Sequence, residues 1–134
     1  MEDPDATVQE VNERFQALHH ELIASARVVK LAHAIDASNQ VGCMMCGFAF
    51  YPISCRPEDV AQAQRDMEIW NYYCMDVMCK GKYPYWAKRY WTENHISLTT
   101  LCEDEKEFAE GTVDFISFSY YRTDCSQATA KVVE

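Results

Sequence analysis

The chain has 134 residues and carries 12 basic against 21 acidic side chains, which gives a formal net charge of −9. An acidic chain lacks the positive surface needed to bind a nucleic-acid backbone or anionic lipid. Apolar residues make up 49%, too many for a disordered acidic tail. No apolar run reaches the roughly 18–20 residues of a transmembrane helix. The acidic start, Met1–Asp5, has no apolar segment typical of a signal peptide. We therefore expect a cytoplasmic protein that binds neither nucleic acid nor a membrane.

Helical and strand patterns alternate along the chain. Apolar residues at helical spacing predict a helix over residues 12–35, and an almost unbroken apolar run predicts a strand buried on both faces over 41–51. A long helical pattern covers 57–78, with Pro57, Glu58 and Asp59 suited to its first turn. Further segments are predicted as short helices at 84–93 and 103–110, a second buried strand at 113–121, a polar stretch from residue 122, and loose ends at 1–11 and 126–134.

This order of a helix, a strand, a long helical crossover and a second strand predicts an α/β protein with parallel strands. Two strands cannot form a stable sheet of that kind on their own. Aromatic residues are 13% of the chain, which is a large share for so short a domain. The pattern therefore indicates one piece, residues 1–134, of a larger core.

Seven cysteines suggest a disulfide or metal site at first sight. Their number is odd and no secretory signal accompanies them, which argues against a disulfide framework. The sharpest pattern is Cys43-Met44-Met45-Cys46, but positions three apart in a strand point to opposite faces. We therefore expect no metal site and interpret the cysteines as small buried apolar residues.

Five stretches of the sequence stand out together, in order and at consistent spacing: Phe15–Ala26, Asn39–Met44, Phe50–Pro52, Cys55–Val60 and Val113–Tyr121. They resemble glycoside hydrolase family 1, and bacterial 6-phospho-β-glucosidases in particular, and the likeness covers roughly residues 12–125. The resemblance implies a (β/α)₈ barrel whose active site lies at the C-terminal ends of the strands. This chain would supply the fourth helix, the fifth strand with its helices, and the sixth strand, which is about a third of the barrel.

Retaining glycosidases need two carboxyl groups about 5–5.5 Å apart, one as acid/base and one as nucleophile. The family places them in Asn-Glu and Glu-Asn-Gly motifs after the fourth and seventh strands. Asn12-Glu13 and Thr92-Glu93-Asn94 imitate these motifs but lack their strand context. We therefore expect no catalytic residue in this chain. The resemblance places Asp114 at the stabilising end of the barrel.

The site residues that the resemblance implies are two tyrosines. Tyr121 matches the family tyrosine that hydrogen-bonds the nucleophile from the end of the sixth strand, and a phenol there can tune a carboxylate. Ser119 stands where the family usually has asparagine. Tyr51, at the end of the fifth strand, is placed to line the sugar pocket. The alternative interpretation of both is a large amphipathic residue at a strand end.

Three hypotheses follow. The first is a fragment of a retaining 6-phospho-β-glucosidase, inactive alone, whose intact form binds a phosphorylated β-glucoside and needs no cofactor or metal. The second is a non-catalytic association module that pairs with a complementary barrel fragment or with a second copy of itself, because exposed strand edges invite pairing. The third, ranked last, is a cysteine-dependent metal or redox protein.

Overall fold

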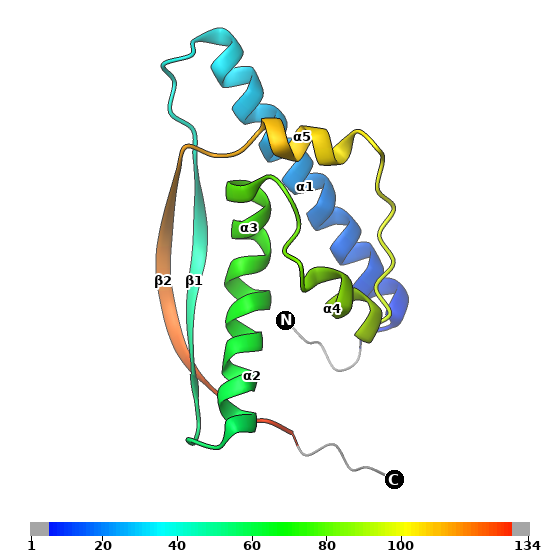
Figure 1. Cartoon of the computed structure of the whole chain (residues 1–134), viewed down its shortest axis with the longest axis vertical. Coiled ribbons are helices and arrows are strands. Elements are labelled where there is room, and N and C mark those ends of the chain that lie inside the picture. Colours follow the sequence, from blue (N-terminus) through cyan, green and yellow to red (C-terminus); the bar gives the residue numbers. More distant parts are fainter. Residues whose placement is uncertain (1–5, 130–134) are drawn as a thin grey trace. The chain divides into compact units, whose positions relative to one another are not determined.

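The computed structural model describes residues 6–129. Most of the predicted elements are present, with shifted ends (Figure 1). In chain order they are α1 (Val8–Ile35), β1 (Gly42–Pro52), α2 (Pro57–Met67), the π-helical turn η1 (Glu68–Tyr72), α3 (Tyr73–Lys80), α4 (Ala87–Glu93), α5 (Asp104–Glu110) and β2 (Phe115–Ser126).

Helix α1 begins before the predicted residue 12 because a capping box fixes its start. The Thr7 hydroxyl accepts the Glu10 N–H, and the Glu10 carboxylate accepts the Thr7 N–H in return. The prediction that residues 1–11 are loose is therefore wrong from Thr7 onward, while residues 1–5 lie outside the described part. At the other end, Asp36 accepts the Ser38 N–H, and the Asn39 amide donates to the Ala32 carbonyl.

The long predicted helix of residues 57–78 is interrupted. Helix α2 ends at Met67, five residues form the wider turn η1, and α3 continues to Lys80. Gly81, in the left-handed region with φ 65°, ends α3 as the sequence predicts. A π-helical turn inserts one residue into the helical ladder and rotates the side chains that follow, so helical spacing could not locate it.

The chain divides into two compact units. The first comprises Met1–Cys43 and Cys74–Phe115, and within residues 6–129 it holds most of the buried apolar side chains. In this unit the inner face of α1 packs against α5. The buried apolar side chains of the unit are Leu22, Ile23, Ala26, Val29, Val77, Trp86, Ala87, Ile96 and Phe108.

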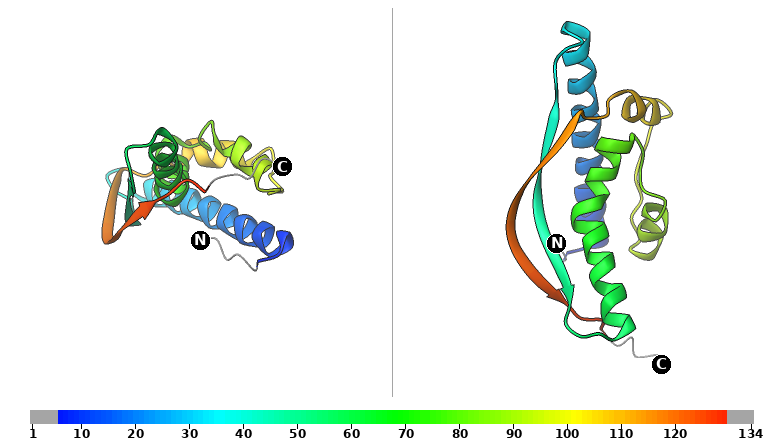
Figure 2. Two further views of the ribbon diagram at one scale, coloured as in Figure 1. Left: turned by 90° about the horizontal axis from the view of Figure 1, so that it is seen from below. Right: turned by 60° about the vertical axis from the view of Figure 1, so that its left-hand side comes forward.

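The second unit comprises Met44–Tyr73 and Ile116–Glu134, and it is poor in core. Among its described residues, the buried apolar side chains are Ala63 and Tyr73. Most of both strands belongs to this unit, and Figures 1 and 2 show β1 and β2 running side by side in the same direction. Backbone bonds from Ile53 to Ser126 and from Asp114 to Val41 fix the same register at both ends.

The prediction of two strands buried on both faces is wrong for this chain. No residue of β1 is buried, and in β2 only Ser126 is. Phe118 and Tyr120 are 70% and 62% exposed. Strand β2 also runs on to Ser126, past the predicted end at Tyr121 and into the stretch expected to be loose. Residues 130–134 lie outside the described part. The strands carry the apolar sequence of a covered sheet, and two strands with one helix cannot cover them.

Within residues 6–129, no helix combines the length and the apolar composition that a bilayer crossing requires.

Candidate functional site

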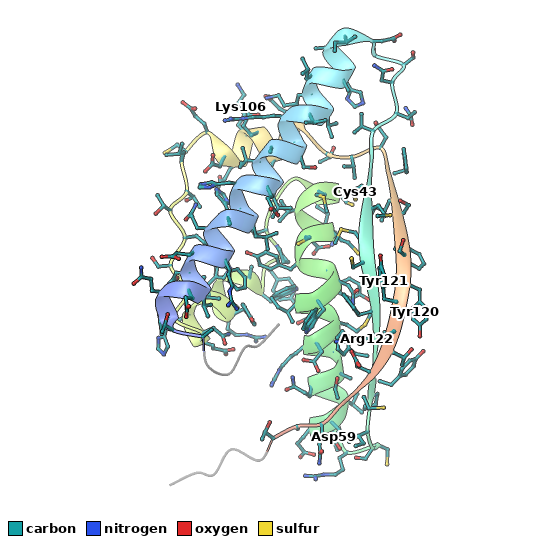
Figure 3. The ribbon with its side chains drawn as sticks, turned by 180° about the vertical axis from the view of Figure 1, so that it is seen from behind. Cys43, Asp59, Lys106, Tyr120, Tyr121 and Arg122 are labelled. Atoms are coloured by element: carbon teal, nitrogen blue, oxygen red, sulfur yellow. The ribbon has the colours of Figure 1, made fainter. Side chains whose placement is uncertain are left out.

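The two tyrosines expected at a site lie on different strands of the small sheet. Tyr121 belongs to β2 and is 64% exposed, and Tyr51 belongs to β1 and is 60% exposed. Figure 3 shows the labelled side chains of Tyr120, Tyr121 and Arg122 grouped along the middle of β2. Within residues 6–129 neither hydroxyl makes a hydrogen bond, and no ring contact joins the two tyrosines. Both hydroxyls are therefore accessible to solvent.

The ring of Tyr121 is held by a contact with the ring of Phe48 on β1. The two rings are stacked, with centroids 6.4 Å apart and an interplanar angle of 30°. The edge of Trp70, from η1, meets the Phe48 ring at 5.4 Å. The guanidinium carbon of Arg122 lies 5.4 Å from the Phe48 centroid, within the range of a cation–π contact.

Asn71, the neighbour of Trp70 on η1, holds the backbone of Phe48. Its side-chain oxygen accepts the Phe48 N–H at 3.1 Å, and its amide nitrogen donates to the Phe48 carbonyl at 2.9 Å. Asn71 is 7% exposed, so both amide groups are paired out of contact with most of the solvent. Sequence reasoning missed this residue, although a polar side chain between Trp70 and Tyr72 on an apolar helical stripe was a usable signal.

The two motif-like glutamates do not form a site in this structure. Glu13 accepts a hydrogen bond from Gln9 on the exposed side of α1. Glu93 lies 3.8 Å from Arg89 in an exposed ion pair one turn away on α4. Thr92 and Asn94 donate to carbonyls of α4 itself, at Lys88 and Tyr90, so they serve the helix end.

The asparagine of the first motif has a structural task. Asn12 accepts the Ser97 N–H at 2.6 Å and donates to the His95 carbonyl at 3.5 Å. One turn further along α1, Gln16 accepts the Thr99 N–H at 2.8 Å and donates to the Thr99 carbonyl at 3.1 Å. We call these two side chains the amide pair. It binds the extended segment 95–99 along α1 as a neighbouring strand would.

A buried histidine continues the same face of α1. His19 is 2% exposed; its Nε2 lies 3.0 Å from the Asp104 carboxylate and its Nδ1 lies 2.8 Å from the Tyr83 hydroxyl. Although burial would raise the pKa of Asp104, hydrogen bonds from the Leu101 N–H and His19 hold that pKa below its usual value. Both ring nitrogens are paired, so His19 joins α1 to the start of α5.

A pocket of about 710 Å³ opens beside this histidine, between α1 and the segment that leads to α5. It is lined by Gln16, His19, His20, Ile23, Ala24, Arg27, Thr99, Leu101 and Asp104. Its buried polar groups are paired with one another, as described above. The pocket therefore lacks an unpaired buried group that would select a ligand.

Two aspartates join distant segments. Asp114 accepts the Val41 N–H at 2.7 Å and contacts His33 Nε2 at 2.9 Å, and these bonds lower its pKa. Asp114 thus fixes the start of both strands, which suits the stabilising role expected for it. Asp59, buried in the first turn of α2, accepts from the Ser54 hydroxyl and the Ala128 N–H, and its pKa falls accordingly. Asp59 therefore joins the segments around Ser54 and Ala128 to the start of α2.

The cysteines are less buried than predicted. Cys46, Cys55, Cys102 and Cys125 are exposed, and Cys43, Cys74 and Cys79 are half-buried. The interpretation as small buried residues is therefore wrong for the first four. Burial raises the pKa of the Cys74 thiol to about 11, and the pKa values of Cys43 and Cys79 also rise. Among the described residues, no three His, Cys, Asp or Glu side chains are grouped as a metal site would require.

Comparison with known proteins gives one consistent result. The family model "Glycosyl hydrolase family 1" matches residues 2–133. Over 116 residues the chain is 44% identical to the 6-phospho-beta-glucosidase AscB of Escherichia coli K12, covering 86% of this chain and 24% of that protein. It is 41% identical over 116 residues to the phospho-cellobiase of Klebsiella oxytoca, covering 87% of this chain and 25% of that protein. The chain thus spans about a quarter of the length of these curated relatives.

Solved structures show the same fold. A beta-glucosidase from Exiguobacterium marinum superposes with a TM-score of 0.76 at 19% identity, over 90% of this chain and 28% of that one. The family 1 b-glucosidase from Thermotoga maritima gives a TM-score of 0.66 at 24% identity, over 81% of this chain and 24% of that one. The two-stranded parallel α/β arrangement is therefore shared with part of the fold of these enzymes.

Proposed function

Because the chain belongs to glycosyl hydrolase family 1, we propose that it is a segment of a retaining 6-phospho-β-glucosidase. The observation that carries the proposal is the naming of its relatives. Six relatives with identities from 44% down to 34% are all named for phosphorylated substrates, whereas the beta-glucosidase A of Acetivibrio thermocellus is 24% identical and the aryl-phospho-beta-D-glucosidase BglC of Bacillus subtilis is 26% identical. The substrate of the whole enzyme would be a phosphorylated β-glucoside, bound only once the barrel is complete.

In this proposal the chain contributes the fourth helix, the fifth strand with its helices, and the sixth strand of a (β/α)₈ barrel. The acid/base and nucleophile carboxyl groups come from the rest of the barrel, so the chain alone is inactive. The reaction forms and hydrolyses a glycosyl-enzyme intermediate and requires no cofactor or metal. The free thiols of the seven cysteines agree with a reducing compartment, which supports a cytoplasmic location.

The role that we assign to this chain within the site is positioning and lining. The Tyr121 hydroxyl, which has no partner within residues 6–129, would donate a hydrogen bond to the nucleophile carboxylate and lower its pKa. Tyr51 would line the sugar pocket from the end of β1. Both are proposals that rest on family membership and on the exposure of the two rings.

The partner of this segment is the remainder of a family 1 barrel. The support is the apolar surface of β2, where Phe115, Ile116, Phe118, Tyr120 and Tyr121 are all exposed. A strand with this composition is found where helices or neighbouring strands cover it. The second candidate function, a non-catalytic module that pairs with its own copy, rests on the same exposed strand.

The test grafts the whole chain into Escherichia coli AscB in place of the stretch that it matches. We expect this chimera to hydrolyse 4-nitrophenyl β-glucoside 6-phosphate in preference to the unphosphorylated glucoside, and the isolated chain to show no turnover above background. Glu13→Gln and Glu93→Gln are controls and should leave the chimera active. A soluble, folded chimera without activity would contradict the proposal. Turnover by the isolated chain that either control abolishes would contradict it too.

A further inference from the structure

We propose that Asn71 is a positioning residue that sets the orientation of Tyr121 by holding Phe48. The inference rests on the proposed function, because it concerns the tyrosine assigned above to the nucleophile. It adds a residue that does not face the substrate and that lies on a helix rather than at a strand end.

The first step is the π-helical turn. Asn71 lies within η1, where the ladder of α2 and α3 is widened. Such turns occur mostly as single insertions in α-helices and are frequently found at functional sites. Here the turn presents two successive side chains to one residue of β1: Trp70 to the ring of Phe48 and Asn71 to its backbone.

The contact between Asn71 and Phe48 requires both a hydrogen-bond donor and an acceptor. Asn71 both accepts from and donates to Phe48, at 3.1 and 2.9 Å. Among side chains of this length only a carboxamide offers an acceptor and a donor in this arrangement. A carboxylate in the same place could accept the N–H but would face the Phe48 carbonyl without a proton to donate. The site therefore distinguishes asparagine from aspartate, although the two have the same shape.

The Phe48 ring in turn contacts the ring of Tyr121. With its backbone held by Asn71 and its ring in a T-shaped contact with Trp70, the Phe48 ring is stacked on the ring of Tyr121 at 6.4 Å. Tyr121 is largely exposed, and this stacking is its ring contact within the described residues. A displaced Phe48 ring would therefore move the Tyr121 hydroxyl. In an active site, misplacement by about 1 Å can cost about a hundredfold in rate.

The experiment has two arms, and the first uses this chain alone. Tyrosine ring signals and the Phe48 amide signal are recorded by NMR for the native chain, Asn71→Asp and Asn39→Asp. Asn39 is the matched control because its amide also donates to a backbone carbonyl, that of Ala32, in the other unit. We expect Asn71→Asp to shift both the Phe48 amide and the Tyr121 ring signals, and Asn39→Asp to shift neither. A moved Phe48 amide with unmoved Tyr121 signals overturns the inference.

The second arm uses the active chimera. We expect Asn71→Asp and Tyr121→Phe each to lower kcat/KM by roughly tenfold or more. Each should also move the acid limb of its pH profile to higher pH, because a nucleophile that loses a hydrogen bond has a raised pKa. The double variant should show little further change, since both act on one interaction. Independent, multiplying losses without a shift of the acid limb would overturn the inference.

Two features keep the outcomes separate. An inactive parent chimera contradicts the proposed function, while the NMR arm still decides whether Asn71 positions Tyr121. Asn71→Gln keeps the amide and lengthens its arm by one methylene, and it replaces Asn71→Asp if the latter fails to fold. We expect it to give shifts in the same direction but smaller, and unchanged Tyr121 signals in a folded Asn71→Gln chain would again overturn the inference.

Discussion

Replacing Gly111 with alanine tests the packing of the first unit. Gly111 ends α5 with φ −115°, which an L-residue can adopt, so any cost is steric. A Cβ there would lie 2.4 Å from the Ala26 carbonyl oxygen and 2.6 Å from both Ala26 Cα and Cβ. Ordinary contact between carbon atoms begins at about 3.5 Å, so α1 and the end of α5 would have to separate by about 1 Å. Neither neighbour is a flexible side chain.

Forced overpacking of this kind costs about 1–3 kcal/mol, which lowers Tm by roughly 4–12 °C for a chain of this size. Thermal unfolding followed by far-ultraviolet circular dichroism and by tryptophan fluorescence measures the shift. Gly47→Ala is the control, because its Cβ would meet the exposed Phe118 ring at 3.1 Å and the Ser119 oxygen at 3.3 Å. The ring can move aside, so we expect a change of less than about 1 kcal/mol. An unchanged Tm in Gly111→Ala, or an equal loss in both variants, would refute the packing argument.

Three further predictions concern the same chain. Because the pKa of Asp104 is lowered in the folded chain, its ionised carboxylate stabilises the fold above the unfolded-state pKa of about 3.9. This contribution is lost as the pH falls through the folded-state pKa. Between pH 5 and more acidic pH, the urea midpoint of Asp104→Asn should therefore drop less than that of the native chain. Iodoacetamide at mildly alkaline pH should label Cys46, Cys55, Cys102 and Cys125 before Cys74, whose pKa is about 11, and mass spectrometry that found Cys74 among the first would contradict its burial. Gln16→Ala removes both bonds to Thr99 and should cost about 1 kcal/mol and speed proteolysis at residues 97–101, while the exposed control Gln40→Ala should change neither.

The sequence predicted the kinds of elements well because their signals are local. Helical spacing found α1, and Gly81 marked the end of α3. The ends were less certain, since the start of α1 depends on a reciprocal bond between Thr7 and Glu10. The π-helical turn was not predictable from spacing, because one inserted residue changes the period of the side chains that follow it.

Burial was the largest error, and it has one physical cause. Apolar runs in the two strands predict coverage on both faces, as in parallel sheets packed under helices. Within residues 6–129 no element buries the side chains of β2, and Phe118 and Tyr120 are exposed. The apolar sequence of the two strands therefore resembles that of the family, but it predicts the wrong exposure for the side chains of β2. The expected roles of Tyr121 and Tyr51 stay predictions.

The amide pair of Asn12 and Gln16 limits substitutions on α1 more strictly than substitutions in the segment 95–99 that it binds. Both side chains bind backbone N–H and carbonyl groups of residues 95–99, so they recognise a main chain without regard to its side chains. Apart from Ile96, whose side chain is buried, substitutions along that segment should be accepted more readily than substitutions of the two amides on α1. Proline at 97 or 99 is the exception, since it would remove the N–H that each amide accepts.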